Sequence, residues 1–289
     1  MFPANFGYVA ARSVEEALQL MTKHGEDGKL LAGGHSLIPA MKLRLQSPQT
    51  LIDLGTVPGL RGVSVDGNNL VIGALTVHAD VASSDLVRKH VPALADAAAV
   101  IGDVQVRNRG TIGGSVAHAD PAADLPVVLT ALNASFVAQS PTGKRTISVD
   151  DFFTDFFTTA LNANEILTEI RVPIPAAGTG TAYAKLPHPA SGYVVVSAAA
   201  MITRQASGTC TASRIAIGGL GSGPIRAIAT ELELQGKPLT TQMIAGAAAK
   251  AAEETDPMEE SYASAEYKRH VATVYARKAI EAAVQRAAK

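Results

Sequence analysis

The sequence of 289 residues contains a single cysteine, Cys210, and no tryptophan. One cysteine excludes a disulfide within the chain, which fits a reducing compartment, and we expect a cytoplasmic protein. It also excludes an iron–sulfur cluster held by this chain alone, because such a cluster needs about four protein ligands. Aromatic residues make up only 4% of the chain, whereas glycine occurs 25 times, so we expect a core packed tightly from small side chains.

The chain also lacks an excess of charge, a long apolar run and a leader sequence. Its 25 lysines and arginines nearly balance its 26 aspartates and glutamates. Nucleic-acid-binding proteins usually carry a basic excess, so we expect no nucleic-acid partner. No apolar run approaches the ~20 residues of a membrane-spanning helix. Residues 1–6 lack the basic and apolar regions of a signal peptide. We therefore expect neither a membrane span nor a signal peptide.

Motifs of several large enzyme classes are missing. Neither G-x-G-x-x-G nor G-x-x-x-x-G-K-[ST] occurs, which disfavours a nicotinamide-dependent Rossmann enzyme and a P-loop ATPase. The absence of G-x-S-x-G disfavours a serine hydrolase. The histidines show no metal-binding spacing such as H-E-x-x-H, so we expect no metal site. We identify no catalytic residue in the chain.

Glycines and small polar residues are concentrated in residues 102–124, between two apolar helical runs. Gly113 and Gly114 allow the backbone to turn tightly and to approach a ligand closely. Thr111 and Ser115 add hydroxyl groups on either side. Successive free N–H groups in such a turn form an anion-binding concavity. The pattern therefore predicts a loop that binds phosphate.

A similar loop, Ala32-Gly33-Gly34-His35-Ser36, occurs earlier in the chain. It lies between a predicted strand over 29–32 and a predicted helix over 37–45, which Ser36 is suited to cap. With a further strand over 50–54, this order predicts a small βαβ unit, in which ligands tend to lie at the carboxyl ends of the strands. The alternative is a plain turn between strand and helix. Two such loops in one chain indicate two contacts with one large phosphate-bearing cofactor.

Three further residues are candidates for contacts with the same ligand. Asp124 follows the second loop, where a carboxylate accepts hydrogen bonds from ribose hydroxyls in many nucleotide sites; alternatively it caps the helix around Pro126. Lys185 and Tyr193 flank a turn at one edge of a predicted C-terminal sheet. There they contact a ring system at a domain interface, or they are merely structural.

Residues 176–180, Ala-Ala-Gly-Thr-Gly, have the composition of a linker, and we expect them to join two regions of the chain. After it, the pattern predicts three strands and three helices. The strands cover residues 181–185, 193–204 and 211–219, and the helices cover 225–235, 242–254 and 264–288.

The motifs of the chain carry a resemblance to a known family. They are A-G-G-H-S-L-I-P at 32–39 with I-D-L at 52–54, R-N-R-G-T-I-G-G-S at 107–115 with A-D-P at 119–121 and D-L-P at 124–126, and A-S-A-E-Y-K-R at 263–269. With them, nearly the whole chain resembles the FAD-binding medium subunit of molybdenum hydroxylases. This is the family of the medium chain of aerobic carbon monoxide dehydrogenase and of the xanthine dehydrogenase FAD subunit.

The resemblance implies an α+β fold and non-covalently bound FAD. A PCMH-type FAD-binding domain of two subdomains, about 1–56 and 57–176, would precede a C-terminal domain, 177–289, with a three-stranded antiparallel sheet and three helices. His35 occupies a position that is often glutamine in the family. The implied cofactor-binding residues are Ala32, Gly33, Gly34, His35, Ser36, Thr111, Ile112, Gly113, Gly114, Ser115, Asp124, Leu161, Lys185 and Tyr193, with Leu161 beside the isoalloxazine ring.

The resemblance also implies partner subunits. A small [2Fe-2S] subunit and a large molybdopterin-binding subunit would form a heterotrimer with this chain, and two heterotrimers would pair. The flavin would receive electrons from the iron–sulfur subunit and pass them to an external acceptor. Two alternatives remain: a self-sufficient flavin oxidoreductase acting on a small substrate, and a non-catalytic assembly subunit. The resemblance implies that the molybdenum subunit selects the substrate, so the sequence leaves the substrate open.

Overall fold

Three parallel strands organise the beginning of the chain in the computed structural model, which describes residues 1–253 and 255–288. The strands β1 (Gly7–Ala10), β2 (Gly28–Leu31) and β3 (Thr50–Asp53) form a sheet in the order β1-β3-β2. Between them lie α1 (Val14–His24), the short 3-10 helix η1 (Gly25–Asp27) and α2 (Leu37–Lys42). The segment β2-α2-β3 confirms the predicted βαβ unit, although α2 ends three residues before the predicted Leu45.

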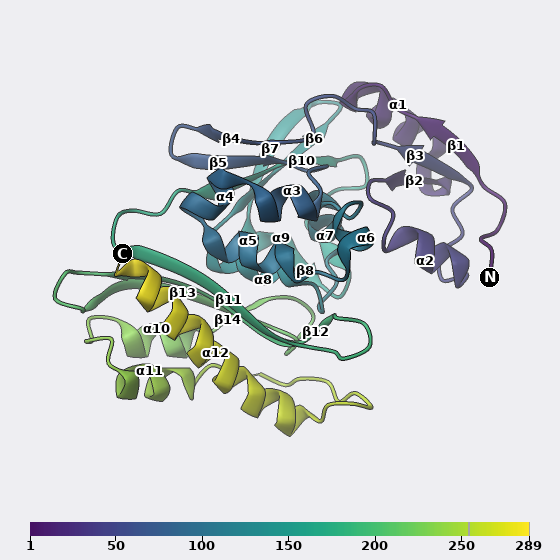
Figure 1. Ribbon diagram of the computed structural model, residues 1–289. Helices are drawn as coiled ribbons and strands as arrows, with labels where there is room; N and C mark the ends of the chain where they lie inside the picture. The colour runs from purple at the N-terminus through teal and green to yellow at the C-terminus, as the bar shows by residue number, and fades with distance from the viewer. Residues whose placement is uncertain (254, 289) are drawn as a thin grey trace.

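An antiparallel sheet of five strands, in the order β4-β5-β10-β6-β7, forms the second unit. One of its faces is covered by helices that belong to the same stretch of chain (Figure 1). The strands of this unit, with the small hairpin β8-β9, are β4 (Val63–Asp66), β5 (Asn69–Gly73), β6 (Ser135–Ser140), β7 (Gly143–Ser148), β8 (Phe153–Asp155), β9 (Thr158–Thr159) and β10 (Ile166–Pro173). The helices are α3 (His78–Ser83), α4 (Asp85–His90), α5 (Pro92–Ala99), α6 (Val104–Arg107), α7 (Ile112–His118), α8 (Asp124–Ala131) and α9 (Val149–Phe152).

The C-terminal sheet contains the three predicted long strands and one short addition. The strands β11 (Thr179–Pro187), β12 (Val194–Arg204) and β13 (Cys210–Gly218) are antiparallel, and the two-residue β14 (Ile225–Arg226) extends the sheet beside β13. The three predicted helices are α10 (Ile228–Leu234), α11 (Thr241–Ala248) and α12 (Ala265–Ala287). The predicted helix over 242–254 ends at Glu254, and the predicted C-terminal domain ends at Lys289. Both of these residues lie outside the described residues.

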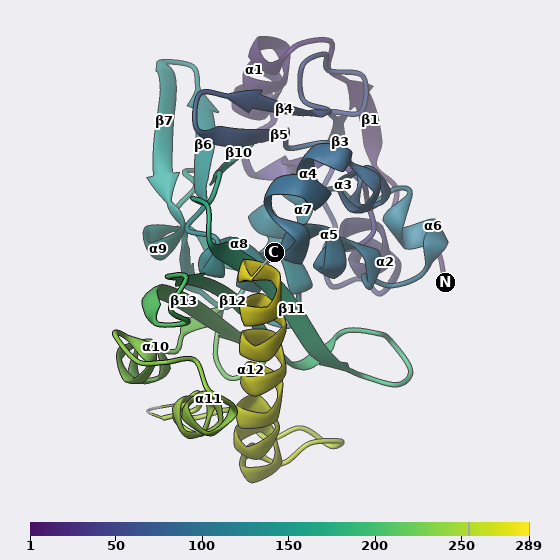
Figure 2. The same ribbon diagram turned by 60° about the vertical axis from the view of Figure 1, so that its left-hand side comes forward.

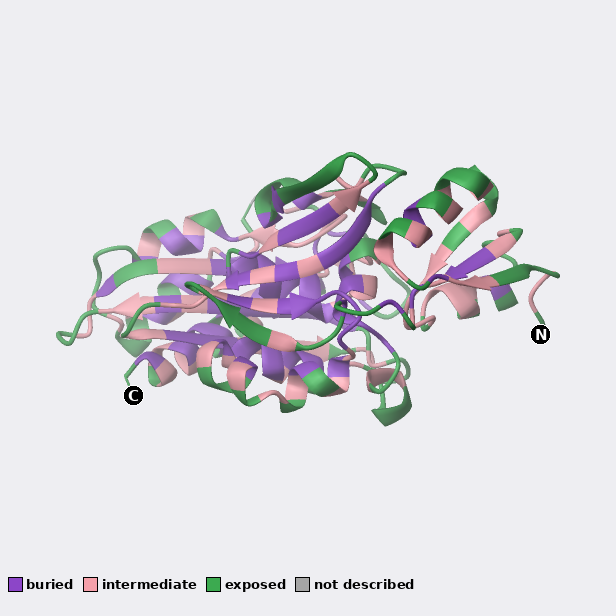
Figure 3. Ribbon diagram, turned by 90° about the horizontal axis from the view of Figure 1, so that it is seen from above, coloured by how far each residue is buried: buried purple, intermediate pink, exposed green. Residues whose placement is uncertain are grey.

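Sheets and helices alternate as layers through the molecule. The helices α5 and α8 lie between the two large sheets and contact β11 and β12, whereas α12 covers the opposite face of β11 and β12 (Figures 1 and 2). Buried residues line the interior of these layers, while the first unit carries mostly exposed and half-buried residues (Figure 3). None of the helices among the described residues is long and apolar enough to cross a membrane. The α+β fold is confirmed.

Small residues let α12 approach β11 closely, as the alanine-rich composition predicts. A Cβ atom placed on Gly180 of β11 would overlap the carbonyl oxygen of Ala283 and the amide nitrogen of Ala287, both in α12. Backbone atoms cannot move aside as a flexible side chain does, so glycine is required at this crossing. By contrast, a Cβ atom on Gly246 in α11 would meet no atom within 4 Å.

We predict that Gly180→Ala lowers the free energy of unfolding by ~1–3 kcal/mol, because it overpacks the crossing of β11 and α12. The matched control, Gly246→Ala, adds the same methyl group to open space in a helix and should be neutral or stabilising. Urea unfolding followed by circular dichroism measures both variants. Equal midpoints for Gly180→Ala and the parent chain would contradict the required close approach.

Candidate functional site

The glycine-rich stretch 102–124 is more ordered than the predicted loop. It contains α6 and α7, and each begins with a side-chain cap: Asp103 accepts the N–H of Val106 at 2.8 Å, and Thr111 accepts the N–H of Gly114 at 3.1 Å. The prediction of a loop across the whole stretch is therefore wrong. Threonine and aspartate at these positions supply the helix caps that glycine alone would not.

The N–H groups at the start of α7 are already hydrogen-bonded within the protein. Ile112 donates to the carbonyl of Thr76 at 3.0 Å, and Gly113 donates to the carbonyl of Ala74 at 2.8 Å. A Cβ atom on Gly113 would lie 2.6 Å from that same carbonyl oxygen, so glycine is needed to dock α7 against the end of β5. The expectation of free N–H groups in this motif is wrong, because tertiary contacts satisfy them.

The first glycine loop has the opposite property. Within the described residues, the N–H groups of Gly33, Gly34, His35 and Ser36 donate to no protein acceptor. Gly34 has φ +75°, a left-handed conformation that favours glycine, and it helps the four N–H groups to follow one another around the turn. Ser36 occupies the cap position of α2 but makes no capping hydrogen bond, so its predicted capping role is wrong. A row of free N–H groups is suited to bind an anion.

The two glycine motifs meet in space although they are far apart in sequence. A Cβ atom on Gly33 would overlap the carbonyl oxygen of Arg109 and would lie 2.8 Å from Cα of Gly110. A Cβ atom on Gly114 would lie 3.8 Å from Cβ of Ala32. The structure therefore brings the two predicted motifs together into one region, as one shared ligand requires.

A buried histidine lies behind this contact and was not identified from the sequence as part of the site. The backbone N–H of His78 donates to the carbonyl of Gly110 at 3.0 Å, and its ring would lie only 2.8 Å from a Cβ atom on Gly110. Its Nδ1 atom has no hydrogen-bond partner among the described residues. Burial, together with the nearby His35 and Arg107, lowers the pKa of His78 to about 4. The neutral ring thus acts as a packing element, and no local pattern in the sequence indicates this role.

Asp124 belongs to a buried polar group at the contact between α8 and the C-terminal sheet. Its Oδ1 atom accepts the phenol of Tyr183 at 2.8 Å and lies 2.8 Å from Nζ of Lys185. Burial raises the pKa of Asp124, and the charge of Lys185 opposes that rise. Ala123 occupies the N-cap position of α8 and Asp124 is the first helical residue, so Asp124 does not stand at the cap position that the alternative predicts. No hydrogen bond to its Oδ2 atom comes from the described residues, which leaves that atom able to accept a ligand hydroxyl.

Lys185 uses all three of its ammonium donors within the protein. Besides Asp124, it donates to the carbonyls of Val100 and Gly192, each at 2.9 Å. An ammonium has three hydrogens, so none is left for another acceptor. The bond to Gly192 fixes the turn that carries Tyr193. A cavity of about 320 Å³ lies beside Lys185, and Asp96, Val100 and Pro187 form part of its lining.

Tyr193 connects this polar group with the first glycine loop. Its side chain is 46% exposed, yet burial of the phenol raises its pKa, and the hydroxyl of Ser36 opposes that rise. The influence of Ser36 on this pKa indicates that Tyr193, in the turn before β12, lies near the first loop.

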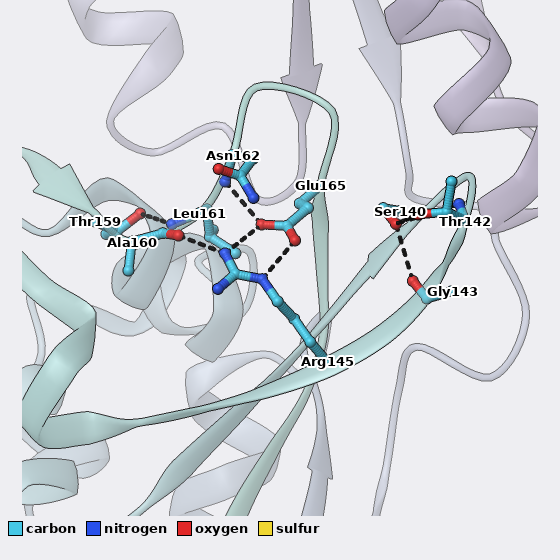
Figure 4. A network of polar contacts seen from close by, with 9 residues as sticks. All are labelled: Ser140, Thr142, Gly143, Arg145, Thr159, Ala160, Leu161, Asn162 and Glu165. Atoms are coloured by element: carbon cyan, nitrogen blue, oxygen red, sulfur yellow. Dashed lines mark hydrogen bonds and ion pairs between the residues drawn. The ribbon is translucent and has the colours of Figure 1, made fainter.

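Leu161 is half-buried in the connection between β9 and β10. Its N–H donates to the hydroxyl of Thr159 at 3.3 Å, and hydrogen bonds to both of its neighbours hold the surrounding backbone (Figure 4). The helix α7 contacts both β9 and β10, and the ring of His118 at its end packs on Phe157 at 5.1 Å between centroids. This connection therefore lies next to the second glycine motif.

Comparisons with known proteins identify the family. Residues 4–175 match the family described as "FAD binding domain in molybdopterin dehydrogenase", and residues 181–283 match "CO dehydrogenase flavoprotein C-terminal domain". The chain belongs to this family of flavoprotein subunits of oxidoreductases, and FAD is its cofactor.

Particular relatives extend over the full length of the chain. The carbon monoxide dehydrogenase medium chain of Hydrogenophaga pseudoflava is 42% identical over 100% of both chains. The 6-hydroxypseudooxynicotine dehydrogenase complex subunit alpha of Paenarthrobacter nicotinovorans is 39% identical over 99% of this chain and 97% of that protein. A solved structure of the Hydrogenophaga pseudoflava carbon monoxide dehydrogenase matches with a TM-score of 0.95 and 44% identity, covering 99% of each chain.

The geometry of the chain fits a dinucleotide of this kind. FAD contains a pyrophosphate, which the free N–H groups of residues 33–36 are suited to bind. It also contains ribose and ribityl hydroxyls, which the unused Oδ2 atom of Asp124 is suited to accept. Glycine at position 33 lets the first loop lie against the backbone of Arg109, and glycine at position 114 avoids a clash with the hydroxyl of Thr111.

We predict that Gly33→Ala raises the Kd for FAD by ~10-fold or more, because its methyl group separates the first loop from Arg109 and Gly110. The control is Gly223→Ala, whose added methyl would meet Phe153 at an ordinary 3.5 Å. Titration of flavin fluorescence measures both. If Gly33→Ala binds FAD as tightly as the control, contact between the two motifs is not needed for binding.

We predict that His78 makes the protein less stable as the pH falls from about 6.5 to about 4. In this window the unfolded chain binds a proton that the folded chain excludes, so stability is fully present above pH 6.5 and is lost towards pH 4, by roughly 3 kcal/mol in total. His78→Gln should flatten this dependence, which urea unfolding at several pH values measures. The control, His270→Gln, replaces an exposed histidine and should keep it. An unchanged slope in His78→Gln would assign the acid sensitivity to other groups.

Proposed function

We propose that this chain is the electron-transfer flavoprotein subunit of a molybdenum hydroxylase complex. FAD held here would receive electrons from a [2Fe-2S] partner subunit and return them to an external acceptor. The observation that carries the proposal is the meeting of two glycine motifs, one with a row of free N–H groups, beside a buried carboxylate with an unused oxygen. The self-sufficient flavin oxidoreductase remains the alternative.

The chain's own residues would bind and orient the cofactor. We assign the pyrophosphate to the first loop, with the start of α7 forming the wall against which that loop packs. Asp124 would accept a cofactor hydroxyl through Oδ2, while Lys185 holds the carboxylate in place. Tyr193 and Leu161 would contact the ring system. The proposed site residues are Ala32, Gly33, Gly34, His35, Ser36, Thr111, Ile112, Gly113, Gly114, Ser115, Asp124, Leu161, Lys185 and Tyr193.

Partner subunits follow from the redox chemistry. Bound FAD supplies the oxidation and reduction, and the protein supplies binding, orientation and electrostatics. With one cysteine, the chain cannot provide the ligands of an iron–sulfur cluster. We therefore propose a small [2Fe-2S] subunit and a large molybdopterin-binding subunit, paired as a dimer of heterotrimers in the cytoplasm. The domain division at about residues 56 and 176 is part of the same proposal.

The substrate of the complex would be set outside this chain. The two relatives described above carry different substrates in their names, carbon monoxide and 6-hydroxypseudooxynicotine, while they share its full length at 42% and 39% identity. A flavoprotein so similar across different substrates fits a common electron exit rather than a substrate site.

We predict that the purified full-length chain binds FAD and shows absorption bands near ~370 and ~450 nm, with FAD released on denaturation. When a co-purified [2Fe-2S] subunit is reduced anaerobically, the ~450 nm band should bleach. The chain alone should turn over none of the candidate small substrates.

Two results would contradict this proposal separately. A folded chain that takes up no added FAD would remove the electron-transfer role and leave the assembly role. A chain that binds FAD and oxidises a small substrate without partners would instead support the self-sufficient oxidoreductase.

A further inference from the structure

An ion pair between an exposed arginine and a buried glutamate anchors the connection that carries Leu161. The guanidinium of Arg145 on β7 bonds both carboxylate oxygens of Glu165, with Nε to Oε1 at 2.6 Å and Nη2 to Oε2 at 2.7 Å (Figure 4). The side chain of Glu165 is only 5% exposed, whereas that of Arg145 is 44% exposed. We call these two residues the Arg145–Glu165 clamp. Bidentate pairs of this kind have a fixed geometry as well as a strong attraction.

The remaining bonds of the clamp go to the two neighbours of Leu161. Arg145 Nη2 donates to the carbonyl of Ala160 at 2.6 Å, and Glu165 Oε2 accepts the N–H of Asn162 at 2.7 Å. The backbone is thus held immediately before and immediately after Leu161, as Figure 4 shows. No helix or strand supports residues 160–165, so the clamp takes the place of regular hydrogen bonding there.

Arg145 reaches this connection across an intervening strand. It lies opposite Ala138 of β6, and Ala138 in turn lies opposite Leu167 of β10. The small alanine leaves room for the arginine to pass over β6 to the start of β10. The sheet does not need the contact between Arg145 and Glu165 to hold β7 and β10 together, because β6 already pairs with both strands through backbone hydrogen bonds.

Stability alone also explains the clamp poorly. An ion pair with one solvent-exposed partner typically contributes little to stability, because the exposed charge keeps much of its hydration and salt screens the attraction. What the pair provides is a directional hold on one short piece of backbone. That piece lies against β9 and β10, which α7 contacts.

We propose that Arg145 and Glu165 are positioning residues of the flavin site, which hold Leu161 against the isoalloxazine ring. This inference rests on the proposed function, since it requires FAD to lie beside Leu161. The clamp acts through the backbone of residues 160–162 and touches no cofactor atom itself.

The test compares two arginines of the same sheet in the full-length chain. Arg145→Met removes the clamp but keeps an apolar stem, and Arg171→Met is the matched control. Arg171 also bonds two oxygens, Glu169 Oε2 at 3.0 Å and Asp66 Oδ2 at 3.1 Å, but it holds no loop. We expect Arg145→Met to raise the Kd for FAD by ~10-fold and to shift the ~450 nm band, whereas Arg171→Met changes neither.

A second pair of variants tests the route through Leu161. Arg145→Lys keeps the charge but loses the bidentate geometry, so it should give a smaller shift of the same band. In a Leu161→Ala background, Arg145→Lys should add no further shift, because the side chain on which the clamp acts is gone. This comparison remains decisive if Arg145→Met does not fold.

The failure of this inference is distinct from the failure of the proposed function. If the parent chain binds no FAD, the proposed function fails. If the parent binds FAD while Arg145→Met matches Arg171→Met in Kd and spectrum, the clamp is only structural. Full additivity of Arg145→Lys and Leu161→Ala would equally overturn the route through Leu161.

Discussion

The close approach of two backbones at Gly33 is the constraint on which the site depends. The first loop lies against Arg109 and Gly110 with no space for a side chain, and this contact joins the small parallel sheet to the second unit. His78 supports the contact from behind with a neutral, buried ring. Because backbone atoms meet backbone atoms, the relative position of the two motifs is fixed by packing and does not depend on flexible side chains.

A second connection joins the second unit to the C-terminal sheet. Lys185 bonds a carbonyl of the helical layer, a carbonyl of its own turn and the carboxylate of Asp124. Removing one partner of such a buried pair leaves an uncompensated charge, which costs ~3–5 kcal/mol. The same bonds fix the turn before Tyr193. Lys185 therefore joins the second unit to the C-terminal sheet and also positions the side chain of Tyr193 between them.

The sequence predicts the pattern of elements well but their hydrogen bonding poorly. The βαβ unit and the three long C-terminal strands follow from local spacing and turn chemistry, whereas the expected meeting of the two glycine motifs rests on one large ligand that needs both. The satisfied N–H groups of Ile112 and Gly113 do not, because their acceptors on Thr76 and Ala74 lie about forty residues away. The roles of His78, Arg145 and Glu165 are likewise set by tertiary neighbours. The flavin assignment of Leu161 came from family resemblance, and no spacing in the chain indicates it.

The two glycine motifs look alike in sequence, but folding makes different demands on them. At the start of α7, Gly113 donates its N–H to Ala74 and packs against it, so the fold requires this glycine whether or not a ligand is bound. The N–H groups of residues 33–36 in the first loop have no acceptor among the described residues. In a descendant that had lost its cofactor, selection for a stable fold would still preserve the second motif but would release His35 and Ser36. The fold therefore requires Gly33 and Gly113, whereas it makes no use of the N–H groups of residues 33–36.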